Sequence, residues 1–209
     1  VTTQHGCGAT TSTRYFRGMG GGHNAEGSTK TVNLTDFRDQ TWQDYPSLAG
    51  QVLSTRTYDT DGTELASTAS QYWSNTTVDG PGFHNAVMVR ESNAYDRERL
   101  VSTGTWREHD VETSWAQAGL PDEVADHGEP GVADNACTNT DYALNMDSVW
   151  GDWNYLELAD EVFTYRGDCT STTKFLTSRA QTFFDGATSV GTNLPSDGNP
   201  TTTRTYRTE

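Results

Sequence analysis

A short strand-and-turn pattern occurs twice in this chain and limits its possible folds more than any other feature. The first copy is residues 56–62, Arg-Thr-Tyr-Asp-Thr-Asp-Gly, and the second is residues 179–186, Arg-Ala-Gln-Thr-Phe-Phe-Asp-Gly. A looser copy, Arg-Thr-Tyr, occupies residues 204–206. β-Branched and aromatic residues at alternate positions favour a half-buried strand, and an acidic residue near a glycine favours the turn that reverses it. The pattern predicts an array of strand–turn units.

A second similarity links residues 120–129 with residues 158–168. Both segments read Leu-x-Asp-Glu-Val, then a short spacer, then glycine and an acidic residue. Such recurrence is typical of repeat architectures, in which each unit stacks on its neighbour, although chance similarity in a biased composition is the alternative. The later segment has some helical propensity, but Pro121 in the earlier one opposes a helix. Both segments are therefore predicted to be strands.

A cysteine follows each of these two segments, Cys137 after the first and Cys169 after the second. Equivalent positions in adjacent units predict a disulfide between them. It closes a loop of about 32 residues, which corresponds to roughly 3–4 kcal/mol of stabilisation in the chain-entropy model. Cys7 is then left for a partner outside this sequence. A zinc site is the rival interpretation, but the chain has neither C-x-x-C nor H-x-x-x-H spacing.

Composition favours thin sheets over a helical core. Apolar residues make up only 33% of the chain, whereas aromatic residues reach 11%. The net charge of −15 argues against nucleic-acid binding, which needs a basic surface, and fits either a high-salt habitat or a solubility role. The chain contains no run of 18 apolar residues, so no membrane span is predicted, and no signal segment is recognised at its start. Because residues 1–3 begin inside a strand-like pattern, we expect a processed product or an excised piece.

The remaining segments read as hairpins, so the predicted fold class is all-β: repeated antiparallel hairpins that form a curved sheet. Residues 1–209 are expected to be one array. Residues 45–50 predict a compact connector with a single helical turn, and residues 78–82 predict a turn. Strands are expected at residues 1–19, 29–35, 52–58, 70–73, 85–90, 100–107 and 111–115.

Several short motifs follow one another in a fixed order along nearly the whole chain. They are Arg14–Met19, Leu48-Ala49-Gly50, Tyr58-Asp59-x-x-Gly62, Gly119-Leu120-Pro121-x-x-Val124, Asp126-His127-Gly128-Glu129, Cys137-Thr138-x-Thr140-x-Tyr142 and Thr182-Phe183-Phe184-Asp185-Gly186. In this order they resemble the rearrangement-hotspot (RHS) or YD-repeat family of large bacterial secreted proteins. The match departs mildly at Phe184, where the YD pair has tyrosine.

The resemblance implies a specific function. Family members wind β-hairpins into a hollow shell that encloses a C-terminal toxin, and this chain looks like shell wall upstream of the autoproteolytic core, which has no counterpart here. The implied partners are the remainder of the same polypeptide and the enclosed toxin. The implied location is secreted or at the cell surface. No catalytic residue, cofactor or metal is expected.

Candidate catalytic and metal-binding residues favour structural roles. The five histidines, His5, His23, His84, His109 and His127, share no spacing, and His127 is predicted to lie in a surface turn. The acid pairs at residues 122–123 and 160–161 suggest a glycosidase, but consecutive strand residues point to opposite faces. Residues 59–64 look like a calcium loop but lack its later ligands, so a plain turn is preferred.

Two other classes of function stay open. A carbohydrate- or cell-surface-binding β domain is suggested by Trp73, Trp106, Trp150 and Trp153, because aromatic platforms stack on sugars. An acidic hydrolase is the weaker alternative.

Overall fold

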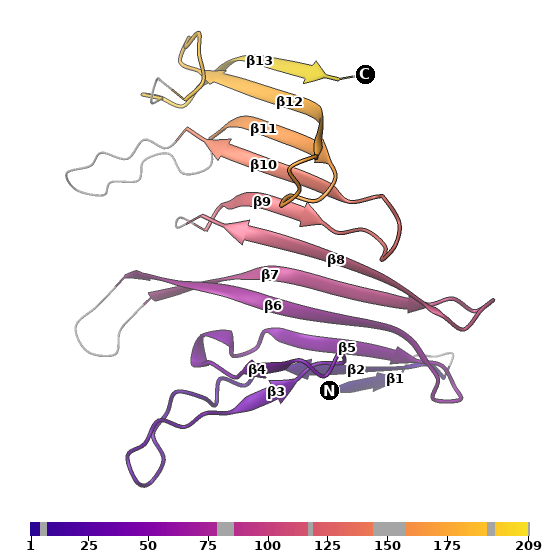
Figure 1. Cartoon of the computed structure of the whole chain (residues 1–209). Coiled ribbons are helices and arrows are strands. Elements are labelled where there is room, and N and C mark those ends of the chain that lie inside the picture. The colour runs from indigo at the N-terminus through magenta and orange to yellow at the C-terminus, as the bar shows by residue number, and fades with distance from the viewer. Residues whose placement is uncertain (5–7, 79–85, 117–118, 144–157, 192–194, 209) are drawn as a thin grey trace. The chain divides into compact units, whose positions relative to one another are not determined.

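The computed structural model describes residues 1–4, 8–78, 86–116, 119–143, 158–191 and 195–208 (Figure 1). Its elements are β1 (Thr2–Gln4), β2 (Thr10–Tyr15), β3 (Asn33–Thr35), β4 (Thr41–Gln43), the 3₁₀ turn η1 (Pro46–Leu48), β5 (Val52–Tyr58), β6 (Glu64–Val78), β7 (Ala86–Arg99), β8 (Trp106–Trp115), β9 (Pro121–Asp126), β10 (Ala136–Tyr142), β11 (Ala159–Arg166), β12 (Phe175–Phe184) and β13 (Pro200–Arg207). The all-β prediction is confirmed, as is the single helical turn in the 45–50 connector.

The strands form one open antiparallel sheet of 11 strands, in the order β1-β2-β5-β6-β7-β8-β9-β10-β11-β12-β13. Only β3 and β4 leave this order, and they pair with each other as a separate hairpin. Nearly every strand therefore hydrogen-bonds to its neighbour in the sequence, which is the hairpin array that the repeats predict. The chain divides into two compact units, residues 1–110 (unit 1) and residues 111–209 (unit 2), which are described separately.

Unit 1 has its core where the β3–β4 hairpin and η1 meet the sheet. Phe16, Leu48 and Leu53 are buried together there, and Leu34 and Trp42 of the hairpin pack against them. Leu53 lies at a register shift, because Tyr15 pairs with Val52 whereas Arg14 pairs with Ser54. A bulge of this kind re-aims side chains locally, and both Leu53 and Ser54 are buried.

Asp36 organises the tip of the β3–β4 hairpin. Its carboxylate accepts hydrogen bonds from the guanidinium of Arg38 (2.8 Å), from the indole of Trp42 (3.2 Å) and from the backbone N–H groups of residues 38 and 40. Arg38 in turn lies over the ring of Tyr95 on β7, 3.4 Å from its centroid. The hairpin is thereby attached to one face of the unit 1 sheet.

A second buried carboxylate, Asp44, closes the segment between β2 and the hairpin. It accepts backbone N–H bonds from Arg17 and Gly18 (2.8 Å each) and from Met19 (3.2 Å). Asp44 is fully buried, and its backbone oxygen also accepts the N–H of Gly20. One side chain therefore satisfies three successive donors of an irregular loop, which otherwise carry the cost of unpaired buried groups.

Small hydroxyl side chains are in register on one face of each unit. In unit 1 this threonine face consists of Thr3, Thr11, Thr13, Thr55, Thr57 and Thr68. In unit 2 the corresponding rows contain Thr113, Thr138, Thr140, Thr164 and Thr205. Residues directly opposite each other on paired strands share a face, so hydroxyl groups line much of one side of each unit, with Ala66, Val124 and Val162 among them. The other side carries the charged and aromatic clusters.

Three of the predicted strands are wrong in part. Residues 1–19 form two strands, β1 and β2, which pair with each other, and residues 16–19 belong to neither. Of residues 29–35 only Asn33–Thr35 form a strand, and it pairs with β4 and not with the main sheet. Residues 100–105 form the reversal between β7 and β8, in which Leu100 bonds to Thr105 and Gly104 adopts a φ of 70°. Leu100 and Val101 are both apolar, yet Val101 is 94% exposed at the turn. The turn predicted at residues 78–82 lies mostly outside the described residues.

Candidate functional site

In the described part of unit 2, charged and polar side chains gather around a disulfide. Cys137 on β10 and Cys169, in the turn after β11, are bonded, with their Cα atoms 5.0 Å apart. The predicted pairing is confirmed. The two cysteines do not occupy equivalent positions, however, because Cys137 is paired across the ladder with Tyr165 whereas Cys169 follows the end of β11. The predicted partner of Cys7 stays open, since residue 7 lies outside the described residues.

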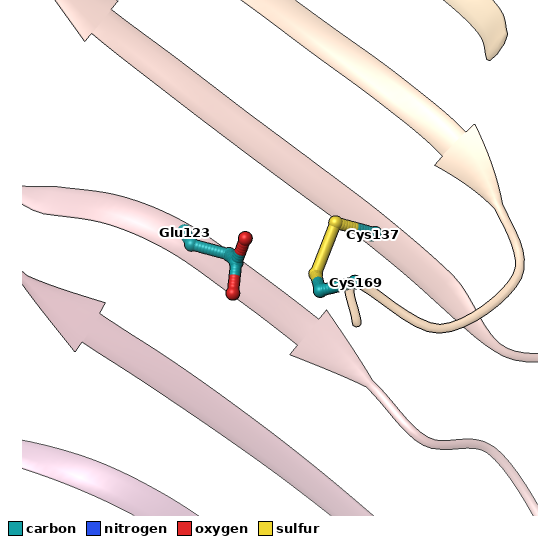
Figure 2. Close-up of side chains that lie close together, drawn as sticks. All are labelled: Glu123, Cys137 and Cys169. Carbon is teal, nitrogen blue, oxygen red and sulfur yellow. A yellow bond between two sulfur atoms is a disulfide. The ribbon is translucent and has the colours of Figure 1, made fainter. Parts of the chain in front are cut away.

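Glu123 on β9 lies beside this disulfide, as Figure 2 shows. One carboxylate oxygen and the two sulfur atoms all lie within 4.8 Å of one another. Asn139 donates a hydrogen bond to the carboxylate (2.8 Å) from the neighbouring strand. In the oxidised protein neither sulfur is a thiolate, so this set offers a metal only one anionic ligand.

The ammonium of Lys174 completes the surroundings of the disulfide. Its Nζ atom donates to the backbone oxygen of Cys169 (3.0 Å) and lies 4.0 Å from Sγ of Cys137. It also lies 4.6 Å from the centre of the Tyr165 ring. The site is an ammonium, a carboxylate and a disulfide enclosed by Ala125 and Tyr165.

His127 makes more contacts than the predicted surface turn implies. Its Nδ1 lies 3.0 Å from a carboxylate oxygen of Asp168, and its Nε2 lies 3.8 Å from Glu112. The imidazole thus connects the β9–β10 and β11–β12 turns to β8. A hydrogen bond from the Thr170 hydroxyl is the main reason that the pKa of Asp168 lies below its ordinary value, and His127 adds to it. The sequence gives no spacing signal for this contact, because residues 127 and 168 are 41 positions apart.

The members of the two acid pairs differ in their surroundings. Asp122 is exposed, while Glu123 is held by Asn139. Glu161 accepts hydrogen bonds from Arg179 and Gln181, so its charge is used within the sheet. Glu123 and Glu161 therefore serve contacts between neighbouring strands.

Asp160 is the exception among these carboxylates. It lies at a register shift in the β10–β11 ladder and is only 5% exposed. Its Oδ2 accepts the N–H of Gly191 (3.0 Å), but its Oδ1 is buried without a hydrogen-bond partner. Burial raises the pKa of Asp160 despite the Gly191 bond, and the nearby charges of Glu161 and Asp141 raise it further.

An open depression of about 430 Å³ lies beneath the β3–β4 hairpin of unit 1, between β2, β3 and β5. None of the described residues that line it is a carboxylate, a histidine or a cysteine. Arg14 at its rim donates to the backbone oxygen of Thr35 (2.9 Å) and so helps to attach the hairpin. The depression is a gap under a docked hairpin and does not gather groups suited to acid–base or nucleophilic catalysis.

Two solved structures match this fold along nearly the whole chain. "Crystal Structure of TcdB2-TccC3-Cdc42" superposes with a TM-score of 0.61 at 10% identity, covering 94% of this chain and 13% of that chain. "Crystal Structure of TcdB2-TccC3" superposes with a TM-score of 0.63 at 9% identity, covering 93% of this chain and 13% of that chain. The chain has an RHS-type fold.

This RHS-type fold confirms the architecture that the sequence motifs imply, and at such low identity it establishes the fold alone. The chain spans about an eighth of the length of these two structures. Neither a protein-family model nor a curated protein sequence matches it. Within the described residues, no helix is long and apolar enough to cross a bilayer.

Proposed function

We propose that this chain is a wall segment of the shell of a secreted or cell-surface RHS-type polypeptide, and that the shell encloses a C-terminal toxin or effector. Its partners are the rest of that polypeptide and the enclosed guest, and the segment itself is not an enzyme. Residues 1–209 act as one array in this proposal. A single cooperative melting transition supports one array, whereas two transitions show independent units.

One observation carries the proposal: the main sheet is built almost entirely by adding strands in chain order. Among the described strands, β1 and β13 each pair with one neighbour only. All eight residues of β13 are exposed. Exposed sheet edges are sites where further strands add, and natural proteins normally cover them. A sheet of this kind extends into a wall by continued hairpin addition, as the fold likeness to a segment of much longer chains also supports.

The hydrogen bonds made by the acidic side chains favour the shell proposal over the hydrolase alternative. Asp36, Asp44 and Asp59 accept backbone N–H bonds in loops and turns, and Glu161 is bonded to Arg179. Carboxylates committed to such bonds hold the fold together, which favours structural roles for them over the paired acid–base roles of a glycosidase. The hydrolase alternative therefore has little support from these residues.

The carbohydrate-binding alternative depended on four tryptophans. The ring of Trp106 is covered by the guanidinium of Arg97, 4.3 Å from the ring centre, so this face is already occupied. Trp73 is half-buried on β6, while Trp150 and Trp153 lie outside the described residues. Binding to a glycan array that is lost on Trp73→Ala substitution favours this alternative over the shell.

The test uses the complete polypeptide that contains this segment. Leu53→Asp places a charge at a 1% exposed core position of unit 1, whereas Val101→Asp places the same charge on a 94% exposed turn. In limited proteolysis we expect the downstream guest to be protected in the wild type and in Val101→Asp, and to be cut in Leu53→Asp. Equal cleavage of the guest in the wild-type polypeptide and after its isolation contradicts the proposed enclosure.

A further inference from the structure

The cluster around the disulfide contains three metal-ligating side chains from three separate places in unit 2. Glu123 comes from β9, Cys137 from β10, and Cys169 from the turn between β11 and β12 (Figure 2). Their ligand atoms already lie within 4.8 Å of one another. Two sulfurs and one carboxylate form a donor set suited to zinc-class divalent cations.

We infer that reduction of the Cys137–Cys169 disulfide creates a binding site for a zinc-class divalent cation. A dithiol or phosphine reductant supplies two electrons to the S–S bond, two protons join the sulfurs, and the reductant is oxidised in turn. Cation binding then releases these two protons, because thiolates are the ligands. The redox state thus decides whether the site exists.

The geometry needs only a small rearrangement. Zinc–sulfur bonds of about 2.3 Å in a tetrahedral site place two sulfurs roughly 3.8 Å apart. Cys169 lies in a turn and not within a strand, so this side of the pair moves without breaking the β-ladder. Asn139 Oδ1 lies 3.4 Å from Sγ of Cys137. The fourth ligand is therefore either this amide oxygen or a water molecule.

Once both cysteines are thiolates, the charges around the site balance only with a dication present. Two thiolates and Glu123 carry three negative charges, and Lys174 supplies one positive charge 4.0 Å from Cys137. A divalent cation brings the sum to zero. Cys137 is completely buried and Cys169 is 9% exposed, so an uncompensated charge in this position is costly.

The neighbour that orients the carboxylate is already in place. Asn139 donates to Glu123 over 2.8 Å, as residues surrounding a metal site commonly do for a ligating group. Cys169, the more exposed of the two cysteines, provides the route by which reductant and cation enter.

The experiment titrates the whole chain with Co²⁺, which reports thiolate ligation through charge-transfer absorption and tetrahedral geometry through visible bands. Phosphine-reduced wild type is expected to bind one Co²⁺ at this site and to lose it to Zn²⁺, whereas the oxidised protein shows neither band. Glu123→Gln is expected to weaken binding by tenfold or more. Asp122→Asn, an exposed carboxylate beside Glu123 on β9, is the matched control and keeps wild-type affinity.

Circular dichroism is followed in the same samples, so that loss of structure is not mistaken for loss of ligands. If reduction unfolds unit 2, refolding on addition of Zn²⁺ supports the site, and persistent unfolding overturns it. Absence of the cobalt bands in the reduced wild type also overturns it, as does equal affinity in Glu123→Gln. The result is independent of the proposed shell function, because it concerns metal binding by the chain alone.

Discussion

Asp59 and Asp185, the acidic residues of the two strand–turn repeats, each accept two or more backbone N–H bonds from the segment that follows. Asp59 accepts from Asp61 (2.9 Å) and Thr63 (2.8 Å). Asp185 accepts from four consecutive residues, 196–199, over 2.8–3.1 Å. The acidic residue of the repeat is therefore a structural hydrogen-bond acceptor, and this use accounts for part of the acidic composition.

Asp185→Ala is expected to free the amides of residues 196–199. Their hydrogen exchange accelerates because the four N–H groups lose their common acceptor, and the melting temperature falls. Asp197→Ala is the matched control, because the bond of Asp197 to Asp185 uses only its backbone N–H. Equal exchange rates in Asp185→Ala and the wild type contradict this structural role.

Acid is expected to destabilise unit 1. Burial raises the pKa of Asp36, but hydrogen bonds from Arg38 and Trp42 outweigh it, and the net pKa lies below 3.8. Burial also raises the pKa of Asp44, and backbone N–H bonds from Gly18 and its neighbours again bring it below 3.8.

A lowered folded-state pKa adds stability at pH values above the unfolded-state value, and that stability is lost as the pH falls through the folded-state pKa. We therefore expect the melting temperature to be level near neutrality and to drop below about pH 4. Thermal unfolding across this range measures it. Asp44→Asn, which keeps one acceptor oxygen but cannot ionise, flattens part of the acid slope.

The alternation of residue types along the strands and the internal repeat were sufficient to predict most of the fold from the sequence. The two Leu-x-Asp-Glu-Val segments became β9 and β11, which flank β10, and their register brought Cys137 close to the turn that holds Cys169. Alternation along a strand is a local property, and a hairpin array adds few long-range choices to it. For such a chain, local pattern is nearly sufficient to predict the order of strands.

Departures from strict alternation could not be predicted in this way. At two register shifts, Leu53 and Asp160 have no cross-strand partner, and no residue type in the sequence predicts such a shift. The β3–β4 hairpin lies outside the main sheet, and Arg38, which is bonded to Asp36, attaches it to Tyr95 of β7, a residue remote in sequence. The His127–Asp168 contact is equally remote in sequence.

Asp160→Asn is expected to stabilise the protein at neutral pH. The folded state holds a buried carboxylate whose Oδ1 has no partner and whose pKa is raised, first by burial. A raised folded-state pKa means that the ionised form costs stability at neutral pH, and that the cost disappears as the pH falls below the unfolded-state value. Asparagine keeps an acceptor for Gly191 without the charge, for a gain of about 1 kcal/mol.

Denaturant unfolding at pH 7 and at pH 4 measures this gain, which shrinks at the lower pH. Asp122→Asn, an exposed substitution of the same chemistry, is the control and leaves stability nearly unchanged. A loss of stability in Asp160→Asn at neutral pH contradicts the assigned cost.

Removal of the disulfide is expected to weaken unit 2. Cys137 and Cys169 are separated by 32 positions, so the double serine variant loses roughly 3–4 kcal/mol in the chain-entropy model. Mass spectrometry of unreduced peptides verifies the link in the wild type, and denaturant unfolding of both proteins measures the difference. Free thiols at both positions in folded wild type contradict the bond.

The threonine face of unit 1 is expected to face the guest, if the proposed shell is correct. Thr68 is exposed on this face, and the opposite face is occupied by the β3–β4 hairpin through Arg38. A surface of small hydroxyl groups can contact a guest without exposing a large apolar patch. A large apolar patch would favour permanent association of the guest with the wall. The sequence also predicts a curved sheet. In the proposed shell the threonine face is the concave side, so the same experiment tests both predictions.

The measurement is maleimide labelling of Thr68→Cys in a Cys7→Ser background, in the isolated chain and in the complete polypeptide. We expect fast labelling in the isolated chain and slow labelling in the assembled shell. Val101→Cys, on the exposed turn between β7 and β8, is the control and should label quickly in both. Protection of Val101→Cys together with free access to Thr68→Cys places the threonine face on the outside and reverses the assignment.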